Sequence, residues 1–433
     1  MSGRFESIDT LRMREFAESG EAHIVDVRPP EAYNGWRLSD EPRGGHIRGA
    51  RSLPARWASY IDWIEIVRSK GILPGRRLVL YGYDQEETAK VAGRFEEAGY
   101  PGPLVYNGFV DGWSADPSLP MQRLRNYRHL VPAEWLAGVL EKGEGPEHDG
   151  GRVVLCHCHY RNPADYDEGH IPHAIPLDTN ILESPKTWNR RDPEELREAL
   201  GGLGIDRDTT VVVYGRFSSP RGEDPFPGSS AGHLGAMRCA FILMYAGVED
   251  VRVLNGGIHS WIEQGYGLTG TEYPPRPVDF GGTVPGRPEL AVDTPEAKEI
   301  LASPGANLVS VRSRREFTGE VSGYNYIEKK GRIPGAVFGN CGSDAYHMEN
   351  YRNLDHTTRE YHEIERLWAE AGITSEKRNA FYCGTGWRAS EAFFNAFLIG
   401  WDGISVYDGG WYEWSGDPSN PTETGDPGDR GII

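Results

Sequence analysis

One cysteine of this chain lies where a strand is expected to give way to a helix. Residues 378–386, RNAFYCGTG, are typical of a strand that ends in a glycine-rich turn, and a helical pattern over 390–400 follows and ends at Gly400. Backbone N–H groups in such a turn, together with the helix N-terminus, stabilise a thiolate or a small anion. Arg388 adds a fixed positive charge. The pattern predicts that Cys383 is an activated nucleophile.

The alternative for Cys383 is a buried, inert thiol, which is the commoner fate of a free cysteine. That alternative does not account for Gly384, Gly386 and Arg388, which follow the cysteine at the junction of strand and helix. We therefore favour the catalytic interpretation.

The elements that must position this cysteine occur three times in the chain. Apolar strands separated by helical patterns predict a parallel sheet with both faces covered, so we expect an α/β fold with three tandem domains over 1–127, 128–288 and 289–433. In each domain a first strand and polar turn precede a second strand and a closing Gly-aromatic turn. The first segments are 23–33, 153–166 and 307–317, the second strands are 76–84, 209–217 and 378–386, and the closing turns are 105–113, 253–261 and 406–414.

The three copies differ at the end of the second strand. Gly82-Tyr83-Asp84 and Gly215-Arg216-Phe217 stand where the third copy has its cysteine. We therefore predict that the first two domains are inactive and that the third is catalytic.

A segment of 13 residues, TGEVSGYNYIEKK, separates Phe317 from Gly331, where the second copy has only Asp167 and Glu168. This segment carries Tyr324 and Tyr326. Aromatic rings that converge with a carboxylate such as Glu316 suit a cationic, partly apolar acceptor, for example a quaternary ammonium ion. Packing alone is the expected role of Trp411 and Trp414, because the other copies keep Trp113 and Trp261.

The composition excludes several classes of protein. With 433 residues and a formal charge of −18, the chain is an ordinary globular protein that binds neither nucleic acid nor anionic membranes non-specifically. No apolar run approaches the roughly 18–20 residues of a membrane helix, and the start lacks a secretory signal. Five cysteines do not make a disulfide scaffold, so we expect a cytoplasmic protein.

Cys156-His157-Cys158-His159 resembles a metal cluster at first sight. Alternation along a strand places the two cysteines on one face and the two histidines on the other, so the four cannot converge on one ion. We expect no metal and no cofactor. The roles of Cys156, of Cys158 and of the insert 216–233, which we considered as a lid, stay open.

The three repeats resemble rhodanese domains, and CGTGWRAS resembles the rhodanese active-site loop. Four residues separate Cys383 from Arg388, which in this fold implies a loop sized for sulfur; related phosphatases use a longer Cys-x5-Arg loop. The resemblance implies that Cys383 alternates between a thiolate and a persulfide, and that the terminal sulfur passes to an acceptor.

The segments SGYNYIEKKGRIPGA and FYCGTGWRAS together resemble the anaerobic ergothioneine synthase family. That family moves sulfur from a cysteine persulfide, supplied by polysulfide, to the imidazole C2 of the betaine hercynine. The resemblance implies that Cys383 carries the persulfide and that Tyr324 donates a proton to an imidazole nitrogen, with Glu316 hydrogen-bonded to the same ring. Arg388 is expected to take part in catalysis, and the other expected pocket residues are Tyr382, Gly384, Thr385, Gly386 and Trp387.

Two other functions remain open at this stage. A thiosulfate or 3-mercaptopyruvate sulfurtransferase would use the same Cys383 chemistry with a small acceptor such as cyanide or a thiol. A non-enzymatic sulfur carrier would hold the persulfide without turning over a small molecule. The aromatic segment around Tyr324 favours the betaine acceptor.

Overall fold

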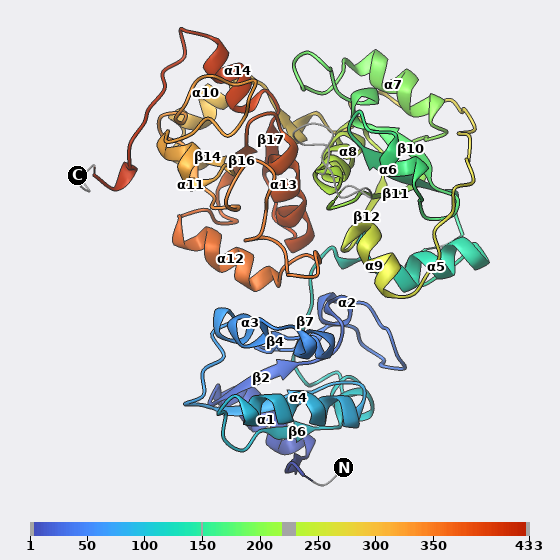
Figure 1. The fold of residues 1–433 in the computed structure, drawn as a ribbon, viewed down its shortest axis with the longest axis vertical. Coiled ribbons are helices and arrows are strands. Elements are labelled where there is room, and N and C mark those ends of the chain that lie inside the picture. Colours follow the sequence, from blue (N-terminus) through green and yellow to red (C-terminus); the bar gives the residue numbers. More distant parts are fainter. Residues whose placement is uncertain (1–3, 149, 219–230, 430–433) are drawn as a thin grey trace. The chain divides into compact units, whose positions relative to one another are not determined.

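The computed structural model describes residues 4–148, 150–218 and 231–429. The chain divides into two compact units, Met1–Arg128 and His129–Ile433. Each of the three predicted repeats contains one five-stranded parallel sheet (Figure 1). The α/β class is therefore confirmed. The sheets run over 7–106, 130–254 and 291–407, each inside one predicted domain, although the domain boundaries themselves stay a prediction.

The first unit contains the first repeat. Its strands are β1 (Ser7–Ile8), β2 (Ala22–Asp26), β3 (His46–Ile47), β4 (Arg51–Ser52), β5 (Arg77–Tyr81), β6 (Leu104–Tyr106) and β7 (Met121–Gln122). Its α-helices are α1 (Thr10–Ser19), α2 (Pro30–Asn34), α3 (Trp63–Ser69) and α4 (Gln85–Glu97).

The second unit contains the other two repeats. The second repeat comprises β8 (Leu130–Val131), α5 (Ala133–Lys142), β9 (Val153–His159), α6 (Ala164–Asp167), β10 (Ile175–Asp178), α7 (Pro193–Gly202), β11 (Thr210–Tyr214), α8 (Gly232–Ala246), β12 (Asp250–Leu254) and α9 (Gly257–Glu263). The third comprises β13 (Ala291–Val292), α10 (Thr294–Ala302), β14 (Ala306–Ser310), α11 (Arg314–Thr318), β15 (Val337–Phe338), α12 (Tyr361–Glu370), β16 (Arg378–Tyr382), α13 (Trp387–Ile399), β17 (Ile404–Tyr407) and α14 (Gly410–Gly416).

The strand order explains where the cysteine lies. The third sheet has the order β13-β17-β16-β14-β15, and the other two sheets repeat it as β1-β6-β5-β2-β4 and β8-β12-β11-β9-β10. The central strand β16 pairs with β14 up to Ser310 opposite Tyr382, so Cys383 follows at the carboxyl edge of the sheet. Ligands bind at this edge in parallel α/β sheets.

Helix α13 begins earlier than the sequence pattern predicts. The helix starts at Trp387 because Gly386, with φ of +92°, turns the chain sharply out of the loop. It ends as predicted at Gly400, which adopts the left-handed conformation with φ of +94°.

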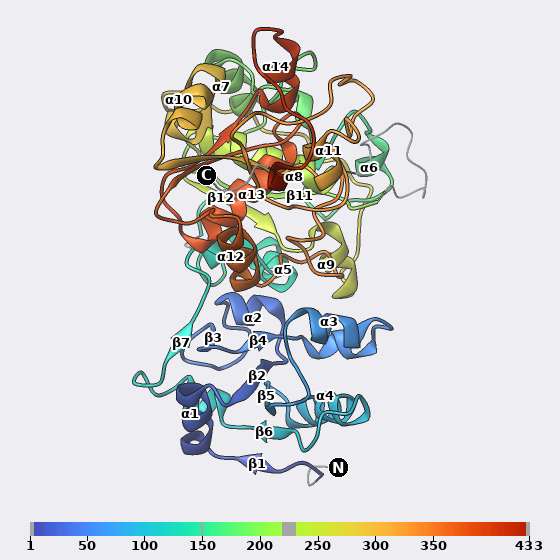
Figure 2. The same cartoon turned by 90° about the vertical axis from the view of Figure 1, so that its left-hand side faces the viewer.

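Helices α8 and α13 pack side by side between the sheets of the second and third repeats (Figure 1). Viewed at 90° (Figure 2), α7, α10 and α14 again lie toward one end of this unit, and α5, α9 and α12 toward the other. The rings of Phe241 and Phe393 meet edge to face at 5.5 Å in the helix contact. Among the described residues, no helix is long and apolar enough to cross a membrane.

A buried ionic cluster crosses the contact between the two repeats. Arg238 on α8 is fully buried and binds Glu183 at 3.1 Å and Asp408 at 2.6 Å. Asp408 also binds the Arg190 guanidinium at 2.9 Å. Both carboxylates lie next to the loop that follows β16: Glu183 accepts a hydrogen bond from the Trp387 indole at 3.0 Å, and an oxygen of Asp408 lies 3.4 Å from where a Cβ atom on Gly386 would be. The second repeat therefore supports the loop of the third.

We expect Arg238→Met to destabilise the second unit strongly, because it leaves Glu183 and Asp408 buried without their shared cation. Removing one partner of a buried ion pair costs about 3–5 kcal/mol. Chemical unfolding followed by fluorescence should show a clearly lower midpoint. Arg197→Met, on the exposed surface of α7, is the matched control, and an equal midpoint for the two variants would contradict this role of the cluster.

Candidate active site

The loop after β16 is fixed through its own carbonyl groups. The Trp411 N–H donates to the Cys383 carbonyl oxygen at 2.8 Å, and the Tyr412 N–H donates to the Gly384 carbonyl oxygen at 2.9 Å. Gly410 has φ of +52°, and a Cβ atom there would lie 2.8 Å from those carbonyl oxygens. Glycine at position 410 is thus required for the loop after β16 to pack against the start of α14.

Tyr324 lies directly against this loop. Its hydroxyl oxygen accepts a hydrogen bond from Arg388 Nη2 at 2.5 Å and another from the Gly384 N–H at 3.2 Å. A phenol oxygen that accepts two hydrogen bonds still has its own proton to donate. Burial raises the pKa of Tyr324 well above its ordinary value, although the Arg388 charge opposes that shift. The hydroxyl therefore keeps its proton at working pH.

Arg388 is held in one orientation by Glu316. Two parallel hydrogen bonds of 2.9 Å join the guanidinium to the two carboxylate oxygens, and Arg388 also donates to the Asp344 carbonyl oxygen at 2.8 Å. Arg312 Nε and the Ser313 N–H donate to the same carboxylate at 3.2 and 2.9 Å. Burial alone would raise the pKa of Glu316, but the Arg388 and Arg312 charges lower it to about 2.

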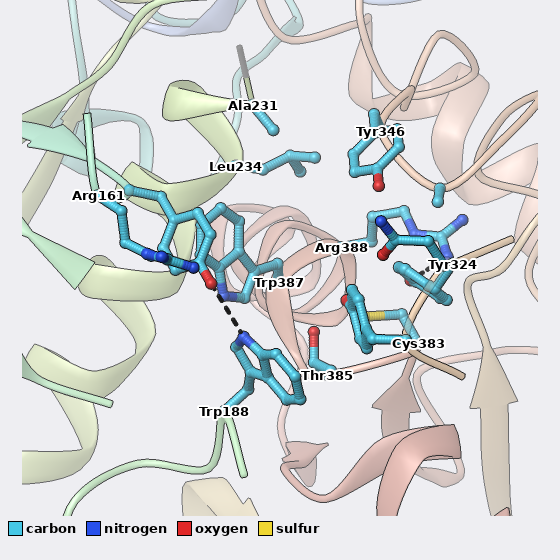
Figure 3. A pocket seen from close by; sticks show the side chains of 14 residues that line it. Arg161, Trp188, Ala231, Leu234, Tyr324, Tyr346, Cys383, Thr385, Trp387 and Arg388 are labelled. Carbon is cyan, nitrogen blue, oxygen red and sulfur yellow. Dashed lines mark hydrogen bonds between the residues drawn. The ribbon is translucent and has the colours of Figure 1, made fainter. Parts of the chain in front are cut away.

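Cys383 opens into a cavity of about 360 Å³ between the second and third repeats. Figure 3 shows Arg161 and Trp387 on one side, Tyr324, Arg388 and Cys383 on the other, and Leu234 and Trp188 above and below. Six of the fourteen lining residues are aromatic. The lining residues are Tyr160, Arg161, Trp188, Ala231, Leu234, Tyr324, Asn325, Tyr326, Ala345, Tyr346, Cys383, Thr385, Trp387 and Arg388.

The structure brings most of the predicted site residues together. Cys383, Tyr324, Arg388, Thr385 and Trp387 line one cavity. Their roles remain a proposal.

Glu316 and Tyr382 are placed differently from the expectation and do not line the cavity. Glu316 is fully buried, with its oxygens held by the two arginines, so it is not placed to bind a substrate directly. Tyr382 is the last residue of β16, and its ring points into the core near Tyr407 at 6.3 Å. Gly384 and Gly386 are also absent from the cavity lining, and the Gly384 N–H donates to the Tyr324 hydroxyl.

The sequence pattern missed the wall that the second repeat supplies. Tyr160 meets the Trp387 ring edge to face at 5.3 Å, and Trp188 stacks on Tyr326 at 4.5 Å. Arg161 and Trp188 have φ of +53° and +59°, a conformation that non-glycine residues rarely adopt and that clusters at functional sites. The positions of Tyr160 and Arg161 just beyond β9, at the carboxyl edge of the sheet, are the signal that could have indicated them.

In the second repeat a different arginine makes the contact with the Gly-x-Ile turn, and Arg161 lines the cavity instead. In each repeat one buried guanidinium donates to the carbonyl oxygen of the glycine in the Gly-x-Ile turn. The three pairs are Arg28–Gly45 at 2.7 Å, Arg312–Gly331 at 2.6 Å and Arg216–Gly169. In the second repeat Arg216 thus makes the contact that the sequence repeat would assign to Arg161, whose charge faces the cavity instead.

The remaining cysteines are buried. Strand β9 alternates as predicted: the His157 and His159 rings lie 6.1 Å apart, while Cys156 and Cys158 interact with Cys239 of α8. No group of possible metal ligands occurs in the part of the chain that the structure describes. Cys341 donates to the Val311 carbonyl oxygen at 2.9 Å, and burial raises its pKa to about 12. Residues 219–230 of the insert lie outside the described part.

Comparison with known proteins identifies the family. The model of the rhodanese-like domain matches residues 11–116, 158–264 and 293–417. The chain belongs to the rhodanese-like family. Thiosulfate sulfurtransferase YnjE of Escherichia coli (strain K12) is 38% identical over 411 residues, which cover 93% of this chain and 89% of that protein.

Two solved structures of EanB resemble the whole chain. An EanB variant in complex with hercynine is 56% identical, with a TM-score of 0.96, over 99% of this chain and all of that one. A second EanB variant carries a cysteine persulfide in a tetrahedral intermediate state with ergothioneine. It is 57% identical to this chain, with a TM-score of 0.95, and the match covers 97% of this chain and 100% of the EanB chain.

We expect Gly384→Ala to displace Tyr324, because the added Cβ atom would lie 2.4 Å from the tyrosine ring. The variant should lose its sulfur transfer by about 10²-fold, the size of effect that follows from misplacing a reacting group by about 1 Å. Gly416→Ala, where a Cβ atom meets nothing within 4 Å, is the matched control. Rate measurements that found the two variants equally active would contradict the close contact between loop and ring.

Proposed function

We propose that this protein is a sulfurtransferase that carries a persulfide on Cys383 and moves its outer sulfur to the imidazole C2 of hercynine, forming ergothioneine. Polysulfide is the proposed donor. The observation that carries the proposal is the Tyr324 hydroxyl, which accepts two hydrogen bonds and faces the cavity of Cys383 with its proton available. The likeness to EanB bound to hercynine and to ergothioneine supports the choice of acceptor.

Catalysis is assigned to the third domain, 289–433. Domains 1–127 and 128–288 have no cysteine at the equivalent strand end, and the second of them contributes Tyr160, Arg161 and Trp188 to the wall. The cytoplasmic location and the absence of a cofactor stay predictions.

The cavity suits a betaine. Trp188, Trp387 and the neighbouring tyrosines present ring faces and edges to a trimethylammonium group, an interaction worth about 0.5–2 kcal/mol. Arg161 supplies a cation for the carboxylate, and Tyr324 lies on the side of Cys383, where the imidazole would be. A substrate with an ammonium group, a carboxylate and a ring thus finds a partner for each group.

Sulfur transfer changes three bonds. A C2–S bond forms, the bond between Cys383 Sγ and the outer sulfur breaks, and the electron pair of that bond leaves on the Cys383 thiolate. The C2–H bond also breaks and the thiolate takes up that proton, so the product gains one sulfur and no other atom. A hydrogen bond or proton from Tyr324 to a ring nitrogen makes C2 more electrophilic, and Arg388, itself held by Glu316, keeps that hydroxyl in place.

The decisive experiment incubates the enzyme with polysulfide and hercynine and measures the betaine by mass spectrometry. We expect a gain of one sulfur with the unaltered protein and none with Cys383→Ser. Activity with thiosulfate and cyanide, which the relative YnjE brings into consideration, should be measured in parallel. Sulfur passing to cyanide but never to hercynine would contradict the proposed acceptor.

We expect Tyr324→Phe to separate the two half-reactions. Loading of Cys383 does not need the phenol proton, whereas transfer to the imidazole does, and general acid catalysis contributes about 10²–10⁴-fold. Single-turnover measurement should find loading near the normal rate and transfer slower by that factor. Tyr412→Phe, outside the cavity, is a matched control. Normal transfer by Tyr324→Phe would remove the tyrosine from the mechanism.

A further inference from the structure

A second cavity, of about 260 Å³, lies beside the first in the same unit. Ala231, Leu234 and Tyr346 line both cavities, so the two spaces adjoin. The second cavity lies at the end of β11, where the second repeat has Arg216 and Phe217 in place of an active-site cysteine. It therefore occupies the degenerate counterpart of the catalytic site.

Nitrogen donors reach this cavity without using all their hydrogen bonds. Arg216 donates through Nε to the Asp165 carbonyl oxygen at 2.8 Å and through Nη2 to Gly169, and Arg352 donates through Nε and Nη2 to Glu391. Neither Nη1 atom has a hydrogen-bond partner among the described residues. His233, only 3% exposed, lines the cavity, and its Nδ1 likewise has no partner there.

Both arginines of the wall lie near carboxylates. Glu391 pairs with Arg352, while Arg216 donates its hydrogen bonds to carbonyl oxygens, and burial lowers its pKa although the Asp165 and Glu168 charges oppose that shift. Glu349 is the carboxylate in the described lining, and one of its oxygens is held by the Ser343 N–H at 2.8 Å. The cavity thus combines guanidinium and imidazole donors in a chain of formal charge −18.

Part of the wall is apolar and polarisable. Phe217 stacks on His233 at 4.3 Å and on His356 at 4.2 Å, and Met348 and Leu354 also line the cavity. Leu354 is 60% exposed, which places an apolar side chain at the mouth of the cavity. Such walls suit a ligand that has an apolar chain and an anionic end.

We propose that this second cavity binds the sulfur donor, an inorganic polysulfide anion, and presents its sulfur end to the adjoining first cavity, which Cys383 lines and which later holds the acceptor. The proposal rests on the function proposed above. The sulfur chain contacts Phe217, Met348 and Leu354, and its charged end meets the free donors of Arg216, Arg352 and His233. Burial and the nearby Arg352 charge keep the pKa of His233 well below its ordinary value, so the neutral ring donates through one nitrogen.

The loading step then balances without a further reagent. The Cys383 thiolate attacks the terminal S–H sulfur of a hydropolysulfide anion, and a bond forms between Sγ and that sulfur. The neighbouring S–S bond of the chain breaks, and its electron pair leaves on a polysulfide dianion that is one sulfur shorter. Donors that stabilise the added negative charge on this leaving chain favour the step.

Leu354 offers a test that spares the fold, because the side chain is largely exposed. Leu354→Asp places a negative charge at the mouth of the cavity, and Leu354→Asn is the matched neutral control. Loading of Cys383 is measured by mass spectrometry over a series of sodium tetrasulfide concentrations, without any acceptor. We expect Leu354→Asp to raise the half-saturating concentration about three- to tenfold, because one added negative charge repels the anionic donor. Leu354→Asn should have a half-saturating concentration close to that of the unaltered protein.

A second pair of variants addresses the donors themselves. The double variant Arg352→Gln/Glu391→Gln removes both buried charges together, and Arg366→Gln on the exposed face of α12 is its control. We expect slower loading only in the double variant, with unchanged binding of hercynine to the Cys383→Ser form of each protein. Equal loading by Leu354→Asp and Leu354→Asn, or a loss of hercynine binding in step with loading, would overturn the donor site. Because loading needs no acceptor, this result does not depend on whether hercynine is the acceptor.

Discussion

The hydrogen-bonded chain from Glu316 through Arg388 to Tyr324 is the constraint on which the rest of the site depends. A buried carboxylate fixes the guanidinium bidentately, and the guanidinium together with the Gly384 N–H occupies the acceptor side of the phenol. The Tyr324 hydroxyl then has one proton left to donate, and the two accepted hydrogen bonds fix the direction in which it points. Arg388 therefore does more than contribute positive charge near the thiol, since the guanidinium that Glu316 holds also fixes the hydroxyl of Tyr324, the residue proposed as the proton donor.

The site belongs to two repeats rather than one. The third repeat supplies Cys383 and Tyr324, while the second supplies Tyr160, Arg161 and Trp188 of the wall and, through Arg238, the cation that binds Glu183 and Asp408. The second repeat has no cysteine at the equivalent position, yet it contributes side chains to the cavity. Because Arg216 makes the structural contact of the Gly-x-Ile turn there, Arg161 can face the substrate cavity.

The fold and the centre of the site could be predicted from the sequence, because both depend on local patterns. Strand periodicity, the repeated turns and the Cys383–Arg388 spacing each signal their structure within a short segment. The placement of Glu316 could not be predicted in this way, since its burial follows from two arginines, one of them 72 residues away. Tyr382 shows the same limit: its neighbour Cys383 leaves the strand at the sheet edge, whereas Tyr382 still belongs to the sheet and turns into the core.

A crystal structure of the Cys383→Ser protein with hercynine tests the orientation of the Tyr324 hydroxyl most directly. We expect the phenol oxygen to lie about 2.6–3.2 Å from an imidazole nitrogen, with C2 facing residue 383 and Arg388 still bound to both Glu316 and the phenol. An imidazole ring whose nitrogens both lie beyond hydrogen-bond range of Tyr324 would contradict it.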